Sequence, residues 1–364
     1  MRVIWSSLLI LVLATFPAQA AEIKIGLAAA LTGSVAGIGE QMSSGAEQAI
    51  ADINAAGGVN GDKLILVKGD DACDPKQAVV VAEQMVNTGV KFVIGHTCSS
   101  TSIAASKVYN EENILMMTPT STQPELTENG LTNIFRICGR DDQEGPAQLR
   151  YFLKHFADKK IAIVWDSSAG QRSMGEQFKK ELNAAGVKEI FSEQYTTGEK
   201  DFSALVTKLR QDSVQVLDIA GFSTEAGLIT RQVKQQGSDI QIIGDDALAT
   251  QEFWSVTGPA GEGVLMSFQP DVAKRTDAEA VADKIRKSGA EAGSYALYTY
   301  AAVQTYADAI RRVGQDPVKV AAALRQAPVS TLLGKISFDA KGDVMGSSYV
   351  LYRWHDGKYA EVGE

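Results

Sequence analysis

The stretch from Gly95 to Thr101, GHTCSST, contains a histidine, a cysteine and several hydroxyl side chains within seven residues. His96 next to Cys98 or Ser99 would suit a general base beside a nucleophile. The same cysteine could instead join a disulfide or a metal site. Hydroxyls and backbone N–H groups at a strand end could also hold a small anion. The surrounding elements must distinguish these four chemistries.

Two of the alternatives find little support along the chain. The three histidines and three cysteines lack the spacing of metal ligands, which argues against a zinc site. The glycine-rich segment Gly33–Gly39, GSVAGIG, lacks the phosphate-binding patterns of nucleotide sites, so no cofactor is expected. A hydrolase that uses Ser99 or Cys98 is the remaining enzymatic alternative. Apart from His96, no histidine lies at a strand end where it could act as the base, so we expect no enzyme activity.

Strand and helix patterns alternate along the chain. We expect a helix around Ala147 to Phe156, and we interpret the charged segment Gly139–Gly145 as a crossover followed by an acidic helix start. The turn signal Asp356-Gly357 indicates a hairpin in the tail. This order predicts an α/β fold with two doubly wound, Rossmann-like lobes. Strands are expected at 23–29, 64–70, 91–95, 114–119, 160–165, 214–222 and 241–246, and β-hairpins at 336–344 and 349–362.

Small and polar residues follow several of these strands. In open α/β sheets, ligands bind beyond the carboxyl ends of the strands, where helix N-termini favour an anion. The strand ends carry the sequences GHTCSS, TPTST, AGFSTE and GDDA. These segments together predict a binding site for a small molecule.

The first twenty residues form a secretory signal peptide. Arg2 precedes the apolar run Ile4–Phe16, and Ala18-Gln19-Ala20 supplies the cleavage pattern, so cleavage is expected after Ala20. The remaining length fits two domains. The net charge of −9 and the scattered cations argue against a nucleic-acid partner.

Several long blocks closely resemble the leucine/isoleucine/valine-binding proteins of bacterial ABC importers. They include DDACDPKQAVVVAEQMV, KFVIGHTCSS, ILMMTPTSTQPELT, GEKDFSALV and FSTEAGLI. The resemblance implies a periplasmic receptor with a type I periplasmic binding fold, whose lobes are joined by three crossover strands and close on an amino acid. It implies lobes of residues 21–140 plus 270–349 and 141–269 plus 350–364.

The resemblance also assigns residues to the ligand's carboxylate. Ser99 and Thr122 match the carboxylate ligands of the family, with Thr120 and Ser121 lining the same place. Their other interpretation is helix capping and turn chemistry. The family's disulfide matches Cys73 and Cys98, which would pin the binding loop next to the pocket. Cys138 and His96 receive no role.

The ligand's ammonium needs a carboxylate partner. Asp246 matches the family's ammonium-binding acid, usually glutamate, and would act together with Thr122; Asp245 is the alternative. Cys98 and four other residues are expected to line the pocket for the ligand's side chain; some match the residue usual in the family and others depart from it. Phe222 matches an aromatic that covers the ligand, Ile38 and Gly170 replace aromatics, and Tyr295 could fill the space that they leave.

We therefore expect a monomeric receptor that delivers a branched-chain or related aliphatic amino acid to a membrane permease. A sensor or regulator on the same fold, and a binding protein for a different amino-acid-like solute, are the alternatives. The two departures Ile38 and Gly170 leave the ligand's side chain open.

Overall fold

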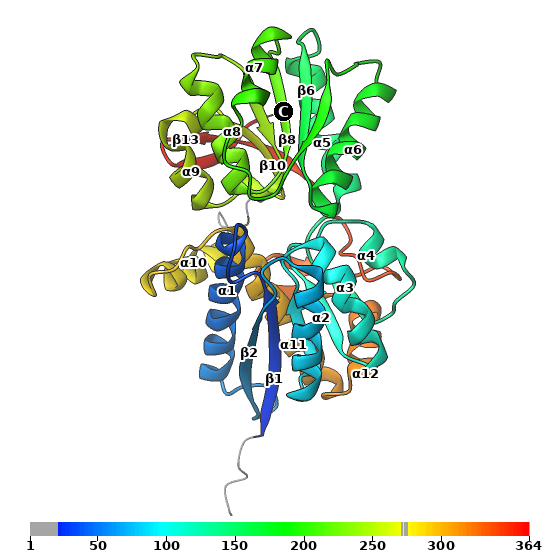
Figure 1. The fold of residues 1–364 in the computed structure, drawn as a ribbon. Coiled ribbons are helices and arrows are strands. Elements are labelled where there is room, and N and C mark those ends of the chain that lie inside the picture. Colours follow the sequence, from blue (N-terminus) through cyan, green and yellow to red (C-terminus); the bar gives the residue numbers. More distant parts are fainter. Residues whose placement is uncertain (1–20, 271, 273–275, 364) are drawn as a thin grey trace, which may run out of the picture.

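The structure is a computed structural model that describes residues 21–270, 272 and 276–363. The expected signal peptide, residues 1–20, lies outside the described residues. Among the helices of the described residues, none combines the length and the apolar character needed to cross a membrane. Figure 1 shows two lobes, one above the other.

The first lobe contains a five-stranded parallel sheet. Two of its inner strands, Phe92–Gly95 and Leu115–Thr118, are short and fully buried, because helices cover both faces of the sheet and leave little room for polar side chains. In spatial order the strands are β2 (Lys63–Asp70), β1 (Glu22–Ala29), β3 (Phe92–Gly95), β4 (Leu115–Thr118) and β5 (Ile134–Arg136). The accompanying helices are α1 (Ala36–Ala55), α2 (Pro75–Asn87), α3 (Ser99–Glu111), α4 (Glu125–Glu128), α10 (Thr276–Lys287), α11 (Ser294–Val313) and α12 (Pro317–Gln326).

The second lobe contains a seven-stranded mixed sheet with an antiparallel edge. In spatial order its strands are β14 (Lys358–Glu361), β13 (Val350–His355), β10 (Leu265–Phe268), β9 (Gln241–Gly244), β8 (Val216–Ala220), β6 (Ile161–Asp166) and β7 (Ser192–Tyr195). Its helices are α5 (Asp141–His155), α6 (Ala169–Ala184), α7 (Ser203–Gln211), α8 (Ser223–Gln235), η1 (Asp246–Leu248), α9 (Gln251–Thr257) and η2 (Gly258–Gly261).

The chain crosses between the two lobes three times. It leaves the first sheet after β5 and returns after β10, when α11 packs against α1. It crosses again after the small hairpin of β11 (Val329–Thr331) and β12 (Gly334–Ile336), and then enters the second sheet as β13. The α/β fold with two lobes and three crossovers is therefore confirmed.

The tail and one helix differ from the sequence expectations. The hairpin around Asp356-Gly357 is confirmed as β13 and β14, but residues 336–344 form only one antiparallel bridge, between Phe338 and Val344. The carboxylate of Asp339 there accepts three backbone N–H groups, which favours a tight turn over a ladder. Helix α5 begins at Asp141, six residues before the expected region, with Arg140 N donating to Gln143 Oε1 over 3.0 Å.

Candidate functional site

A cavity lies between the two lobes, at the carboxyl ends of both sets of parallel strands. One wall comes from the first lobe and the other from the second. Its lining residues are Ile38, Cys73, Thr97, Cys98, Ser99, Ser100, Thr120, Thr122, Asp141, Ser168, Gly170, Gln171, Met174, Phe222, Asp246, Ala247 and Tyr295.

The structure brings nearly all the sequence-predicted residues to this cavity. Ser121 is the exception, because its hydroxyl lies 2.7 Å from Ser102 Oγ and donates to the carbonyl of His96 over 3.0 Å. Alternate residues of an extended segment face opposite sides, so Thr120 and Thr122 reach the cavity and Ser121 does not. The predicted residues on the wall are Ile38, Cys98, Ser99, Thr120, Thr122, Gly170, Phe222, Asp246 and Tyr295.

His96 has a structural place behind the binding loop. Its ring is fully buried, with Nδ1 2.5 Å from Asp71 Oδ2 and Nε2 2.9 Å from the Tyr109 hydroxyl. Its carbonyl accepts from the hydroxyls of Thr118 and Thr120, each over 3.2 Å. Both ring nitrogens are therefore engaged away from Ser99 and Cys98, and the residue joins β3 to the loop after β4.

The disulfide between Cys73 and Cys98 is present, with the Cα atoms 5.7 Å apart. It connects the loop after β2 to the residue that precedes α3, and both cysteines line the cavity. Cys138 is free and buried, and burial raises the pKa of its thiol far above the usual range. The disulfide thus fixes the position of the α3 N-terminus relative to β2.

Removing this disulfide should lower stability without abolishing the fold. On the loop-entropy view, a cross-link over 25 residues stabilises by about 3 kcal/mol. We expect the Cys73→Ser/Cys98→Ser double variant to unfold at a clearly lower temperature than the parent, measured by circular dichroism. Cys138→Ser is the matched control, and a reductant should lower the melting temperatures of the parent and of this control but not that of the double variant. Equal melting temperatures for the double variant and the parent would contradict this prediction.

The first residues of α3, Ser99 and Ser100, line one side of the cavity. The first N–H groups of a helix have no acceptor within the helix, and α3 has no side-chain cap. Ser99, its first residue, accepts from Gln123 N over 3.2 Å, which leaves its hydroxyl proton for another acceptor. The helix dipole adds partial positive charge at the same end. This wall suits a carboxylate.

The opposite side of the cavity is acidic. Asp246 lines the cavity and is 7% exposed, whereas Asp245 does not line it. The Asp245 carboxylate instead accepts from Ala247 N over 3.0 Å and from Gly221 N over 3.1 Å. Asp245 therefore holds the loop after β9, and Asp246 is the acid that is available to a ligand.

Two further acids, which the sequence analysis did not single out, lie beside Asp246. Asp141 lines the cavity, and its Oδ1 is buried without a hydrogen-bond partner. Glu144 is fully buried, accepts from Asp246 N over 3.0 Å and accepts from the Ser267 hydroxyl. Both belong to the first turn and a half of α5, the segment interpreted from sequence as an acidic helix start after a crossover. Because the chain crosses between the lobes here, the start of α5 is buried beside the cavity.

Burial and mutual repulsion raise the pKa values of these acids. Burial, followed by the charge of Asp141, raises the pKa of Asp246 to about 8. Burial raises the pKa of Asp141 to about 6, against the opposing effects of the Thr122 hydroxyl and Arg136. Burial and the charges of Asp246 and Asp245 hold the pKa of Glu144 well above its usual range. A cation in the cavity would relieve this repulsion.

Several contacts hold the lobes together around the cavity. The Tyr295 hydroxyl, from α11, donates to the carbonyl of Asp246 over 2.7 Å. A side chain on Gly170, in α6, would begin 3.7 Å from Ser99 Cβ, so the N-termini of α6 and α3 face each other closely. Glu291 accepts from Gln41 Nε2 over 2.8 Å and from Gln251 N over 3.1 Å. The two walls therefore stand within reach of one small ligand.

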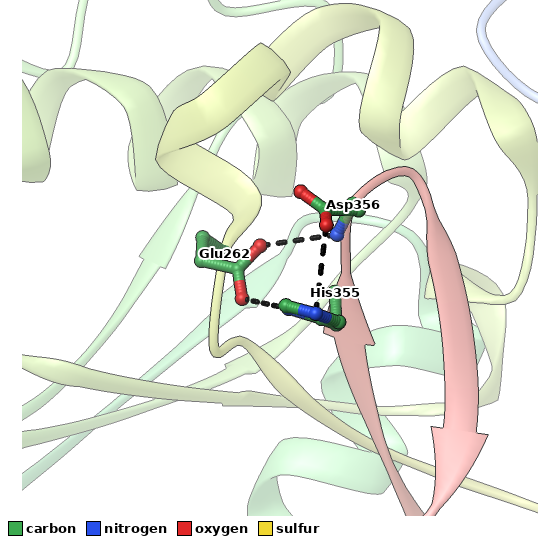
Figure 2. A group of neighbouring side chains, drawn as sticks. All are labelled: Glu262, His355 and Asp356. Carbon is green, nitrogen blue, oxygen red and sulfur yellow. Dashed lines mark hydrogen bonds and ion pairs between the residues drawn. The ribbon is translucent and has the colours of Figure 1, made fainter.

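A separate group of potential metal ligands lies on the surface of the second lobe. Figure 2 shows Glu262 beside His355 and Asp356 of the terminal hairpin. His355 Nδ1 lies 2.6 Å from Glu262 Oε1, and this partner raises the pKa of the imidazole. All three side chains are exposed, and Asp356 N also donates to Glu262 over 3.1 Å. These bonds attach the turn of the terminal hairpin to Glu262, which accounts for the proximity of the three side chains.

Comparison with known proteins agrees with this architecture. The sequence matches the family described as periplasmic binding protein over residues 22–358. The chain belongs to the periplasmic binding protein family. Within it, the chain is 45% identical over 344 residues to Leu/Ile/Val-binding protein homolog 1 of Brucella melitensis, covering 93% of each. It is 44% identical over 347 residues to an amino acid binding protein of Pseudomonas aeruginosa, covering 94% of this chain and 93% of the relative.

A solved structure of the family gives the same arrangement. The chain resembles an ABC transporter substrate-binding protein of Desulfitobacterium hafniense in complex with leucine, with a TM-score of 0.76 and 26% identity. The match covers 94% of this chain and all of that one, 100%. The type I periplasmic binding fold expected from the sequence is therefore confirmed, and the family is one of transport-binding proteins.

Proposed function

We propose that this protein is the substrate-binding component of an ABC importer and captures a branched-chain or related amino acid between its lobes. The observation that carries the proposal is the opposition of charge across one small cavity. The α3 N-terminus with Ser99 lies on one side, and the carboxylates of Asp246 and Asp141, the second of which is hydrogen-bonded by Thr122, lie on the other. An amino acid zwitterion has the complementary charges.

The roles of individual residues follow from this orientation. The ligand carboxylate accepts from the Ser99 hydroxyl and from N–H groups of the α3 first turn. The ammonium binds Asp246, with Thr122 and Asp141 adjacent to it. Phe222, Ile38 and Tyr295 contribute apolar surface to the same cavity.

The wider setting belongs to the same proposal. The receptor acts in the periplasm after cleavage behind Ala20, works as a monomer without catalysis, and presents the closed complex to a membrane permease. The lobes of residues 21–140 plus 270–349 and 141–269 plus 350–364 would move about the three crossovers, a hinge motion that captures ligand. The matched relatives named for leucine, isoleucine and valine, or for amino acids, support the ligand class.

A thermal-shift screen tests the proposal. A cognate amino acid at a hundredfold excess over its dissociation constant should stabilise the protein by about 2.7 kcal/mol. The melting temperature should rise for the zwitterion and stay unchanged for its N-acetyl derivative and for the matching amino alcohol, which lack one charge each. Equal shifts from these derivatives, or no shift from any amino acid, would overturn the proposal.

A further inference from the structure

Two polar atoms on one wall of the cavity, Gln171 Oε1 and Ser168 Oγ, have no hydrogen-bond partner among the residues that the structure describes. Gln171, in the first turn of α6, lines the cavity and is 8% exposed, and its Oε1 atom is buried without a hydrogen bond. Ser168 is the N-cap residue of α6, yet its hydroxyl does not cap the helix and is also buried without a partner. Buried polar groups are normally hydrogen-bonded. A ligand is a natural source of the missing partners.

Most of the other polar groups of the cavity already have a partner or a proposed role. Thr97 Oγ1 accepts from Ala30 N over 3.0 Å, and the Thr120 hydroxyl donates to the Thr97 carbonyl over 2.8 Å. Ser99 and Asp246 are complementary to the two charged groups of a zwitterion. Gln171 and Ser168 are therefore available to the remaining part of an amino acid, its side chain.

The space beside these two groups is open. Gly170 lies between them in sequence, and a Cβ atom added to it would make only ordinary contacts, 3.7 Å from Ser99 Cβ and 3.9 Å from Ser99 Oγ. A ligand side chain can therefore approach the α6 N-terminus without displacing the backbone. Met174, one turn further along α6, provides an apolar neighbour on the same wall.

We infer that the cavity selects an amino acid whose short side chain ends in a hydroxyl or a primary amide, with Gln171 and Ser168 as the specificity-determining residues. The inference rests on the proposed function and narrows its ligand to a polar relative of the branched-chain amino acids. The Gln171 amide and the Ser168 hydroxyl can each donate and accept. A ligand group with the same double capacity satisfies both.

An aliphatic ligand would leave these groups unsatisfied. A closed cavity that contains leucine or valine excludes water from the Gln171 amide and offers it no partner, and such unpaired groups weaken binding strongly. Sites built to bond a substrate hydroxyl or amide reject the analogue that lacks it far better than apolar pockets reject an added group. The expected preference for the polar member of an isosteric pair is at least about tenfold.

Calorimetry with isosteric pairs tests this inference. The parent protein should bind threonine at least about tenfold more tightly than valine, or asparagine at least about tenfold more tightly than leucine. Gln171→Met keeps the volume of the side chain and removes its hydrogen bonds, so the preference should shrink toward one or reverse. Ser168→Ala should also reduce the preference for the polar member of each pair. Circular dichroism and melting curves check that both variants fold.

The outcomes separate this inference from the proposed function. Tight binding of leucine or valine, with no gain for the polar isosteres and no change in Gln171→Met, overturns the inference and leaves the amino acid receptor intact. If no member of either pair binds and no other zwitterion raises the melting temperature, the proposed function fails as well. An affinity loss of at least about thirtyfold in Asp246→Asn, whatever the ligand's side chain, supports the proposed function, and unchanged affinity in that variant counts against it.

Discussion

Replacing Asp246 by asparagine should remove tight binding while leaving a protein that is at least as stable as the parent. The variant keeps the size of the side chain and removes the charge that we propose faces the ligand's ammonium. Removing one partner of a buried charge pair costs about 2–5 kcal/mol of binding free energy. We expect an affinity loss of at least about thirtyfold, measured by calorimetry with the amino acid that the thermal-shift screen identifies.

The gain in stability has a separate cause. In the unliganded protein the pKa of Asp246 is raised to about 8 by burial and by Asp141, so the charged form is unfavourable in the folded state. An asparagine carries no such penalty. At pH 8 the unliganded variant should therefore melt at a higher temperature than the unliganded parent, a result that a merely disruptive substitution would not give.

Asp245→Asn and Asp239→Asn are the matched controls for this experiment. Asp245 accepts two backbone N–H groups, so its amide would place a donor against one of them and lower the melting temperature. Asp239 is exposed before β9, at the opposite end of the strand from Asp246, and its variant should behave as the parent. Unchanged affinity in Asp246→Asn would contradict the assignment of the ammonium site.

Seven of the parallel strands could be predicted from the sequence because most are short apolar runs followed by small or polar residues, whereas β5, β7 and β10 were not among the expected strands. The strands predicted to end at 95, 119, 222 and 246 end at Gly95, Thr118, Ala220 and Gly244, and the loops that follow them line one cavity. The disulfide was implied by the family resemblance alone, since the chain spacing of Cys73 and Cys98 does not fix a pairing.

The acidic part of the site could not be predicted in the same way. Asp141 and Glu144 stand in a charged segment, which is typical of a solvated helix start. Their burial arises because the chain crosses from β5 to α5 between the lobes, and this packing depends on residues about a hundred positions away, such as Asp246. No local pattern contains that information.

Gln171 was missed although a local signal existed. The buried residues of α6 recur at helical spacing, at Gln171, Met174, Gly175, Phe178 and Leu182. A glutamine on the otherwise apolar and small-residue face of a helix indicates a buried polar group that needs a partner. Ser121, by contrast, was predicted to line the cavity and does not, because three consecutive hydroxyls cannot all face the same side of an extended segment.

Ligand binding should release a proton near neutral pH. Most of the groups that surround Asp246 and Asp141, and that could influence the pKa values of these two residues, are acidic or neutral. Arg136 lowers the pKa of Asp141, but it is itself bonded to Asp343 over 2.8 Å. With a pKa of about 8, the Asp246 carboxyl holds a proton at pH 7, and it releases this proton when the ligand's ammonium binds to it. The other neighbours are Glu144, Asp245, Thr122, Tyr295, Tyr349, Cys138, Arg140 and Asp142.

The sign of the pH dependence follows from this linkage. Binding favours the ionised carboxyl, so affinity should rise as the pH rises from about 6 to about 8, by at most about tenfold per pH unit for one proton. The unliganded fold shows the opposite trend. The folded pKa values of Asp141 and Asp246 are raised, so their stabilisation is complete below the unfolded value and is lost as the pH rises through about 6 and about 8.

Calorimetry in two buffers of different ionisation enthalpy measures the proton directly. At pH 7 the observed binding enthalpies should differ by the difference between the buffers multiplied by about one released proton. Asp141→Asn removes the charge that helps to raise the pKa of Asp246, so its rise in affinity should occur at lower pH and its proton release at pH 7 should be smaller. Identical enthalpies in both buffers, together with a flat affinity between pH 6 and pH 8, would mean that Asp246 is already ionised before the ligand arrives. In that case a group other than the ligand must compensate its charge inside the closed cavity.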